Sequence, residues 1–421
     1  MSTLFNDMKY AFRQLFKTPS FILITILTLA MVMGIIVLSG KVRRSKDTKS
    51  CSLTSHNKLG LIHLNENGTQ FICTECGNRF FAWGFNYDHD DSGRLIEDYW
   101  QEEWETVVED FNEMRDLGAN LVRIHLQLAR FMETPDRPNQ AALQQLARLV
   151  ELAETTGLYL DITGLACYHP KDVPEWYDTL DDNDRWEVQA RFWEAVAQTC
   201  AKSNAIFCYD LMNEPFLPGR GEKASVWLGD AFGGKHFMQR ITLDLAGRTP
   251  KQVAGAWVRK LVAAIQKHDP RHMITVGAIA WVHTFPKAKP IFYAKEVSKS
   301  LDFVSVHVYP QKGEIKKALT ALKAYDIGKP LVIEETSPLY CGIEDFNDFI
   351  ERSYNRVDGY VGFYWGKTID EYRQSNDSIS AGIMAEWLKY FDTKKPEIFG
   401  IPQQQEDLQH EVISVVGDSQ D

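Results

Sequence analysis

Cysteine is scarce in this sequence: its 421 residues include seven, an odd number scattered along the chain. Only the segment CTEC, residues 73–76, holds a close pair, and no second pair completes the roughly four ligands of a structural zinc site. Such a set shows no disulfide framework. We therefore predict no metal site, and we interpret CTEC as a turn that joins two short strands.

Over most of the chain, positively charged residues are fewer than negatively charged ones. The net charge is −11, yet residues 1–49 carry eight Lys and Arg against two Asp and Glu, so the other 372 residues carry −17. An acidic body argues against a nucleic-acid partner. The sequence also lacks a glycine-rich phosphate loop after its first apolar run, residues 80–85, which disfavours a doubly wound dinucleotide fold. We predict no cofactor.

Charge is absent from residues 18–40, a segment long enough to cross a bilayer as a helix. A buried core helix is the alternative, but basic residues flank the segment on both sides. With the basic amphipathic stretch before it, this segment predicts a single-pass membrane anchor within residues 1–40. A polar linker at 41–58, a globular body at 59–400 and a polar tail at 401–421 complete the predicted organisation.

The location of the body is predicted from two signals that disagree. Five basic residues follow the span within 41–49 and three precede it, which by the positive-inside rule favours a body in the cytoplasm. However, MKYAFRQLFKTPSFILITILTLA, residues 8–30, resembles the start of bacterial ABC-transporter permeases, which implies an anchor and no transport function. That resemblance, and the substrate class argued below, favour the outer side (periplasmic or extracellular), which we expect.

From about residue 60, apolar runs alternate with amphipathic stretches. The runs lie at 80–85, 121–126, 158–163, 206–212, 273–277, 303–309, 331–335 and 360–365, separated by helix-like stretches such as 101–117, 141–156, 185–201 and 250–268. Eight such units predict an α/β fold, the (β/α)8 TIM barrel. Its active face lies at the C-terminal ends of the strands, and here those ends carry carboxylates, imidazoles and aromatic rings.

Two motifs at strand ends carry the functional prediction. CYDLMNEPF places Asn213 and Glu214 at the end of the fourth run, and LVIEET places Glu334 and Glu335 at the end of the seventh. In this order the motifs resemble retaining glycoside hydrolases on (β/α)8 barrels, most closely glycoside hydrolase family 5 (cellulase- and mannanase-like enzymes). The resemblance implies Glu214 as acid/base, Glu335 as nucleophile, and a bond from Asn213 to the sugar 2-hydroxyl.

Only one of the two adjacent glutamates is expected at the site, because neighbouring strand residues point to opposite faces. Alternation does not choose between them, since both faces of this run are apolar. The resemblance selects Glu335. Glu334 is then expected behind the site, paired with a neighbour or bonded to backbone.

Five further positions match residues of the family. Arg123 corresponds to an arginine that supports the nucleophile, and Tyr309 and His307, on one strand face, to residues that bond the nucleophile and touch substrate. Trp365 corresponds to a sugar platform, and Asn86 to the asparagine of the first strand. For the arginine, histidine, tyrosine and tryptophan a structural role in the core or in an ion pair remains the alternative.

One departure from the family concerns the end of the third strand, where a histidine is usual. GLYLDITGLACYHP has Thr163 and Leu165 there, so His169 from the next loop or His125 from the second strand is the replacement. We predict a membrane-anchored retaining β-glycosidase that acts on β-linked glucan, mannan or shorter glycosides. The alternatives are a catalytically silent carbohydrate-binding or sensing barrel and a transglycosylase.

Overall fold

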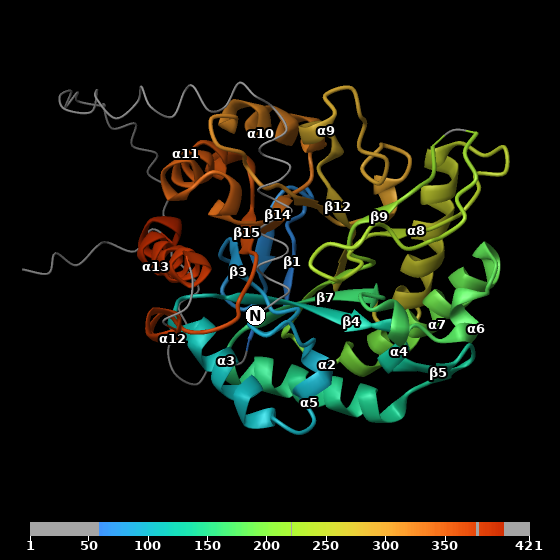
Figure 1. Ribbon diagram of the computed structural model, residues 1–421, viewed down its shortest axis with the longest axis horizontal. Helices are drawn as coiled ribbons and strands as arrows, with labels where there is room; N and C mark the ends of the chain where they lie inside the picture. Colours follow the sequence, from blue (N-terminus) through green and yellow to red (C-terminus); the bar gives the residue numbers. More distant parts are fainter. Residues whose placement is uncertain (1–58, 220, 376–378, 400–421) are drawn as a thin grey trace, which may run out of the picture.

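The computed structural model describes residues 59–219, 221–375 and 379–399. Its main sheet has nine strands in the order β11-β8-β7-β4-β3-β15-β14-β13-β12, and all of them pair in parallel. Only Val276 separates β11 (Met273–Thr275) from β12 (Gly277–Ile279), the strands at the two ends of this order. The sheet therefore closes into a barrel of eight strand positions, with the fifth split in two (Figure 1).

Each predicted apolar run overlaps a barrel strand, which confirms the predicted (β/α)8 fold. The other strands are β3 (Ala82–Asn86), β4 (Leu121–Gln127), β7 (Tyr159–Ala166), β8 (Ile206–Asp210), β13 (Val304–His307), β14 (Leu331–Thr336) and β15 (Gly359–Gly362). The longer helices surround the strands (Figure 1): α3 (Trp104–Asp116), α5 (Gln140–Thr156), α7 (Asp182–Cys200), α8 (Pro250–Gln266), α10 (Ile315–Leu322), α11 (Ile343–Ser353) and α13 (Ile379–Phe399). Short elements decorate the connections: α2 (Ile96–Tyr99), α4 (Leu128–Phe131), β5 (Met132–Thr134), β6 (Arg137–Pro138), α6 (Glu175–Asp178), β9 (Pro215–Phe216), β10 (Gln239–Arg240), α9 (Trp281–Thr284) and α12 (Ile369–Gln374).

Helix α5 shows how the sequence sets these elements. The side chain of Asn139 accepts hydrogen bonds from the first backbone amides of the helix, and Gly157, with φ +77°, ends it in the left-handed conformation that glycine favours. Between them, buried residues recur every three or four positions, including Leu146, Leu149 and Ala153. The apolar stripe therefore faces the barrel and fixes the helix against it.

A hairpin closes the N-terminal end of the barrel. Its strands, β1 (Ile62–Leu64) and β2 (Phe71–Cys73), are antiparallel. The buried ring of Phe71 lies 5.1 Å from that of Phe207 and 5.2 Å from that of Phe303, and both partners stand at the N-terminal ends of barrel strands. CTEC begins at the end of β2 and forms a turn, as interpreted from the sequence. The opposite end of the barrel is left for chemistry.

The predicted membrane span at residues 18–40, the linker at 41–58 and the tail at 401–421 lie outside the described residues. Among the helices of the described ranges, none combines the length and the apolar character that crossing a bilayer requires.

Candidate active site

A buried arginine organises the C-terminal end of the barrel. Arg123, on β4, is fully buried. Its Nη1 donates to Glu335 Oε1 at 2.7 Å and to Asn86 Oδ1 at 2.8 Å, and its Nη2 donates to Asp210 Oδ2 at 2.8 Å and to Asn213 Oδ1 at 3.0 Å. The planar guanidinium therefore joins the ends of β3, β8 and β14, as its fork of fixed donors allows.

Glu335, at the end of β14, is held by donors on both of its oxygens. Arg123 binds Oε1, and the Tyr309 hydroxyl donates to Oε2 at 2.8 Å, with His307 Nδ1 at 3.4 Å from the same oxygen. Burial raises the pKa of the Glu335 carboxyl, as does the nearby Glu214, while His307 and Arg123 act against that shift. These donors favour the ionised carboxylate, and 8% of the side chain remains exposed.

Glu214 follows β8 in an uncommon backbone conformation. Its φ is +48°, in the left-handed region, and its N–H donates to the Gly277 carbonyl at 2.9 Å. Non-glycine residues in such conformations cost on the order of 1–3 kcal/mol and cluster at functional sites. The turn brings Glu214 Oε1 to 2.9 Å from His307 Nδ1, with 16% of the side chain exposed.

His307 lies between the carboxyl groups of the two glutamates. One oxygen of Glu214, one of Glu335 and a nitrogen of His307 all lie within 4.8 Å of one another. Burial alone would lower the pKa of His307, but the carboxylates of Glu335, Glu214 and Glu334 outweigh it and raise that pKa to about 10. The imidazole is therefore a cation at neutral pH, and it lies between the two carboxyl groups.

The same three side chains, Glu214, His307 and Glu335, have the spacing of metal ligands. The Arg123 guanidinium, however, already binds Glu335 at 2.7 Å. Both nitrogens of His307 also contact carboxyl groups already, Nδ1 that of Glu214 at 2.9 Å and Nε2 that of Glu334 at 3.3 Å, and a metal ion would have to replace such a contact. The arrangement fits acid–base and nucleophilic chemistry better than metal binding.

The two predicted asparagines bond mainly to the protein. Asn213 accepts from Arg123, and its Nδ2 donates to the Phe237 carbonyl at 3.0 Å. Asn86 is fully buried, and its Nδ2 donates to the carbonyls of Glu334 at 2.9 Å and Gly362 at 3.3 Å. Asn86 therefore lies buried behind Arg123 and supports it, and its side chain has no exposed surface.

Trp365 does not lie where the resemblance suggests. Its ring is fully buried and packs against Phe85, with 5.8 Å between ring centroids. Strand β15 ends at Gly362, three residues before the end of the predicted run, and partly exposed Phe363 follows. The Phe363 ring lies 6.3 Å from Tyr309 and 6.2 Å from His89. Phe363, and not Trp365, is thus the aromatic side chain that this strand end brings beside Tyr309.

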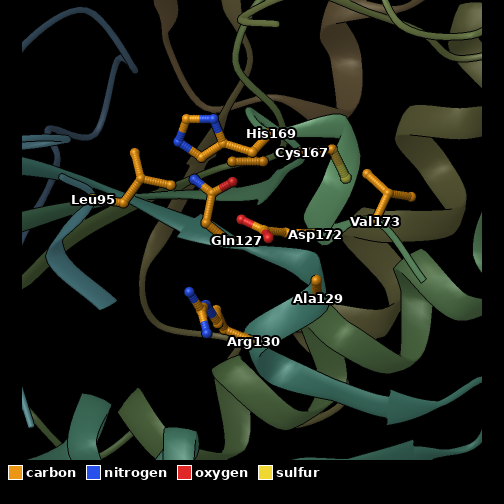
Figure 2. A pocket seen from close by; sticks show the side chains of 9 residues that line it. Leu95, Gln127, Ala129, Arg130, Cys167, His169, Asp172 and Val173 are labelled. Atoms are coloured by element: carbon orange, nitrogen blue, oxygen red, sulfur yellow. The ribbon is translucent and has the colours of Figure 1, made fainter. Parts of the chain in front are cut away.

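The two candidate histidines for the third-strand position lie in different surroundings. His169 lines a small pocket with Gln127, Arg130 and Asp172 (Figure 2), and the charges that act on it come from Lys235, Asp172, Lys171 and Asp98. His125 is buried in the site, with Nε2 at 3.2 Å from Asn86 Oδ1 and Nδ1 bonded to the Tyr168 hydroxyl. Of the two, the structure places His125 at the site, and His169 in the adjacent pocket.

The floor of the site includes Asp210 and Asp161, which the sequence prediction did not include, together with Glu334, which was expected behind the site. Asp210 Oδ2 accepts from Thr163 at 2.9 Å, and Oδ1 accepts from the Gly277 amide at 2.6 Å. Glu334 and Asp161 are also buried here. An acidic residue within an apolar strand run, as in LYLDIT and CYDLM, was the available sequence signal.

Glycine is required at position 277 by this floor. A Cβ there would lie 2.6 Å from Glu334 Oε2, 2.7 Å from Asp210 Oδ2 and 2.9 Å from Arg123 Nη2. We expect Gly277→Ala to lower the free energy of unfolding by about 1–3 kcal/mol in urea denaturation, and to reduce activity. Gly382→Ala in α13, where a Cβ meets nothing within 4 Å, is the control and should not destabilise. Equal effects of the two substitutions would contradict the crowded floor.

The long connection 216–249 returns to the site. The His236 amide donates to the Tyr168 carbonyl at 2.9 Å, and the Phe237 ring lies 4.8 Å from that of Tyr168. Phe237 packs on a small buried cluster formed by Leu95, Ala166 and Tyr168. This connection therefore packs against the loops that follow β3 and β7.

Comparisons with known proteins agree with this architecture. The family model described as Cellulase (glycosyl hydrolase family 5) matches residues 76–336, more than half of the chain. Similar solved structures include the exo-β-1,4-mannosidase Op5Man5 from Opitutaceae bacterium strain TAV5 (16% identity, TM-score 0.58, covering 80% of this chain and 63% of that one). The endoglucanase Cel5A catalytic domain from Thermobifida fusca has 16% identity and a TM-score of 0.52, and the match covers 80% of this chain and 97% of that one. The β-1,4-mannanase from the sea hare Aplysia kurodai has 14% identity and a TM-score of 0.54, with the same coverage of 80% and 97%.

At these identities the likeness to solved structures shows the fold alone. The chain spans less than two thirds of the length of the mannosidase. No curated protein matches the sequence.

Proposed function

Because the chain belongs to the cellulase family, glycosyl hydrolase family 5, and is a glycoside hydrolase, we propose that it cleaves β-linked glucan, mannan or shorter β-glycosides with retention of configuration. The observation that carries the proposal is the closeness of the two carboxyl groups, whose nearest oxygens lie within 4.8 Å. Retaining enzymes hold this pair about 5–5.5 Å apart, whereas inverting enzymes leave about 6.5–9.5 Å for a water molecule.

In the first step, Glu335 attacks the anomeric carbon while Glu214 gives its proton to the departing glycosidic oxygen. The bond from carbon to that oxygen breaks as the ester to Glu335 forms. Arg123 and Tyr309 fix the attacking carboxylate by bonds of 2.7 and 2.8 Å. This geometry leaves Glu335 with one reactive orientation, which lowers the entropic part of the barrier.

In the second step, Glu214, now ionised, takes a proton from water, and the hydroxide oxygen displaces Glu335 from the anomeric carbon. The product keeps the β configuration and Glu214 regains its proton. His307 Nδ1, at 2.9 Å from Glu214 Oε1, donates to this carboxyl when it is ionised. An alcohol in place of water would give transglycosylation on the same residues.

The proposal that a membrane anchor at residues 18–40 holds the catalytic body on the outer side rests on the sequence alone. A reporter fused to the C-terminus in the native membrane tests it, because the body and the reporter share one side of a single span.

The configuration of the first product tests the retaining reaction. We expect ¹H NMR of the purified full chain acting on aryl β-glucosides and β-mannosides, and on their short oligosaccharides, to show the β-anomer before mutarotation. Early α-anomer would overturn retention. Binding of oligosaccharides without turnover of any substrate would instead favour the silent carbohydrate-binding barrel.

A further inference from the structure

A second glutamate on β14 contacts the same cluster of site residues. Glu334 is fully buried, and its Oε2 lies 3.3 Å from His307 Nε2 and 3.5 Å from Arg123 Nη2. The pairing of β14 with both neighbouring strands shifts register at this point. Both Glu334 and Glu335 therefore contact Arg123 and His307, against the expectation from simple alternation that only one of them belongs to the site. Glu334 contacts Nε2 of the His307 imidazole, and Glu335 contacts Nδ1.

The floor holds more carboxyl groups than it can keep ionised. Three of them, Glu334, Asp210 and Asp161, are buried together with Glu335 around two cations, Arg123 and His307. Charges in a water-free interior are tolerated only when they are paired. At least one of these carboxyl groups must therefore be neutral.

The unpaired oxygens show where the proton lies. Glu334 Oε1 and Asp161 Oδ1 are both buried, and neither has a hydrogen-bond partner. The electrostatic interaction between these two carboxyl groups shifts the pKa of each of them. Two neighbouring buried carboxylates would repel each other, so one of the two groups carries a proton.

The surroundings of the two groups decide which one is protonated. Burial, and then the charge of Glu334, raises the pKa of Asp161 well above its usual value. Burial would also raise the pKa of Glu334, but Arg123 and His307 outweigh it and hold that pKa at about 2. Asp161 is thus the neutral member of the pair and Glu334 the carboxylate.

We propose that Glu334 is a positioning residue for hydrolysis: as a buried carboxylate 3.3 Å from His307 Nε2, it keeps His307 in the imidazolium form. The inference rests on the proposed function, which it deepens. Glu334 touches no reacting atom and acts only through the histidine.

A permanent cation at His307 serves both chemical steps. Its Nδ1 lies 2.9 Å from Glu214 Oε1 and 3.4 Å from Glu335 Oε2. Negative charge moves from Glu335 to Glu214 when the glycosyl ester forms, and it returns when the ester is hydrolysed. Because the imidazolium lies beside both groups, the charge shifts without the loss of its counterion.

The charges around this unit come from several strands. His307 faces Glu214 after β8, Glu334 and Glu335 on β14, and Arg123 on β4. Glu334 in turn faces Arg123, His307 and Asp161, and its charge also acts on Asp210. Removal of the Glu334 charge leaves the other charged neighbours of His307 in place, so only the contribution of Glu334 to the pKa of His307 changes.

The titration of His307 tests the proposal directly. In the ¹⁵N-labelled full chain, NMR of the imidazole nitrogens should show His307 protonated up to about pH 9, and Glu334→Gln should lower its midpoint by about one unit or more. We also expect Glu334→Gln to lower kcat/KM for an aryl β-glycoside by about twofold or more near pH 9, where a lowered midpoint leaves about half or more of His307 neutral, and by less near pH 5, where His307 stays charged in both proteins. A group that only fills space would leave the midpoint unchanged.

Two further variants keep the test decisive. Asp161→Asn replaces a neutral acid with a neutral amide of similar shape, so the His307 midpoint should stay within about 0.3 units of wild type and kcat/KM within about threefold. Asp302→Asn removes a partly buried carboxylate, which accepts from the Ile274 amide at the opposite end of the barrel, and controls for lost stability.

Three results would overturn the proposal: a neutral His307 at pH 8 in the wild type, an unshifted midpoint in Glu334→Gln, or a loss in Asp161→Asn as large as that in Glu334→Gln. Because the histidine titration needs no turnover, it separates failure of this proposal from failure of the proposed function. If Glu334→Gln does not fold, the wild-type and Asp161→Asn titrations still decide the outcome.

Discussion

Glu335→Ala should abolish turnover of an activated aryl β-glycoside, with kcat reduced by about 10⁴-fold to 10⁶-fold. The substitution removes the carboxylate that Arg123 and Tyr309 hold at 2.7 and 2.8 Å, and no other group replaces its bond to the anomeric carbon. Added azide should restore part of the rate, because a small anion fits the space that the carboxylate leaves, and its product should have the α configuration. Initial rates with a dinitrophenyl glycoside, with and without azide, measure both effects.

Glu214→Ala is the matched comparison for that experiment. Loss of the acid should slow substrates with poor leaving groups far more than dinitrophenyl glycosides, whose departure needs little proton transfer. Azide should here give a β-configured product, since the ester to Glu335 still forms. Turnover retained in Glu335→Ala, or equal slowing of all leaving groups in Glu214→Ala, contradicts the proposed roles.

Arg123→Leu should have the largest effect on stability, a loss of about 3–5 kcal/mol in the free energy of unfolding. It leaves the carboxylates of Asp210 and Glu335, at 2.8 and 2.7 Å in the wild type, without their buried counterion. Urea denaturation at neutral pH measures the loss. Arg79→Leu is the control: this arginine binds Asp358 at 2.7 Å but is 30% exposed, so a loss of about 1 kcal/mol or less is expected.

The stability difference between wild type and Arg123→Leu should also depend on pH. In the wild type, Arg123 and His307 hold the pKa of Glu334 at about 2, below the value of about 4.5 for an unpaired glutamate. The corresponding stabilisation is fully present above pH 4.5 and is lost as the pH falls toward 2. The two proteins should therefore approach each other in stability over that range. A constant difference would show that the arginine stabilises by packing and not by charge.

Periodicity predicted the barrel well because each strand is a short apolar run with a helix behind it. It failed at the end of β15, where GYVGFYW is apolar and aromatic throughout and nothing in the composition shows that the strand stops at Gly362. The resemblance assigned the sugar platform to Trp365, which is buried in the structure, whereas Phe363 just after the strand end is partly exposed.

Local sequence also could not predict the partners of the two adjacent glutamates. The alternation of strand residues holds for an unbroken pairing register, and the register of β14 shifts beside His307 and again before Thr336. That shift depends on strands that are distant in the sequence. The motif could therefore identify Glu335 by resemblance, but it could not show that Glu334 contacts the same arginine and histidine.

The hairpin at the N-terminal end of the barrel has a consequence for how a long polymer meets this enzyme. Described residues begin at Leu59 on that face, where its carbonyl accepts from Asn204 and the Gly60 carbonyl accepts from the Tyr159 hydroxyl. A tether attached through the preceding segment would therefore hold the molecule at the N-terminal end of the barrel. The candidate active site lies at the C-terminal end, so such a tether and a bulky glycan would not compete for the same side of the protein.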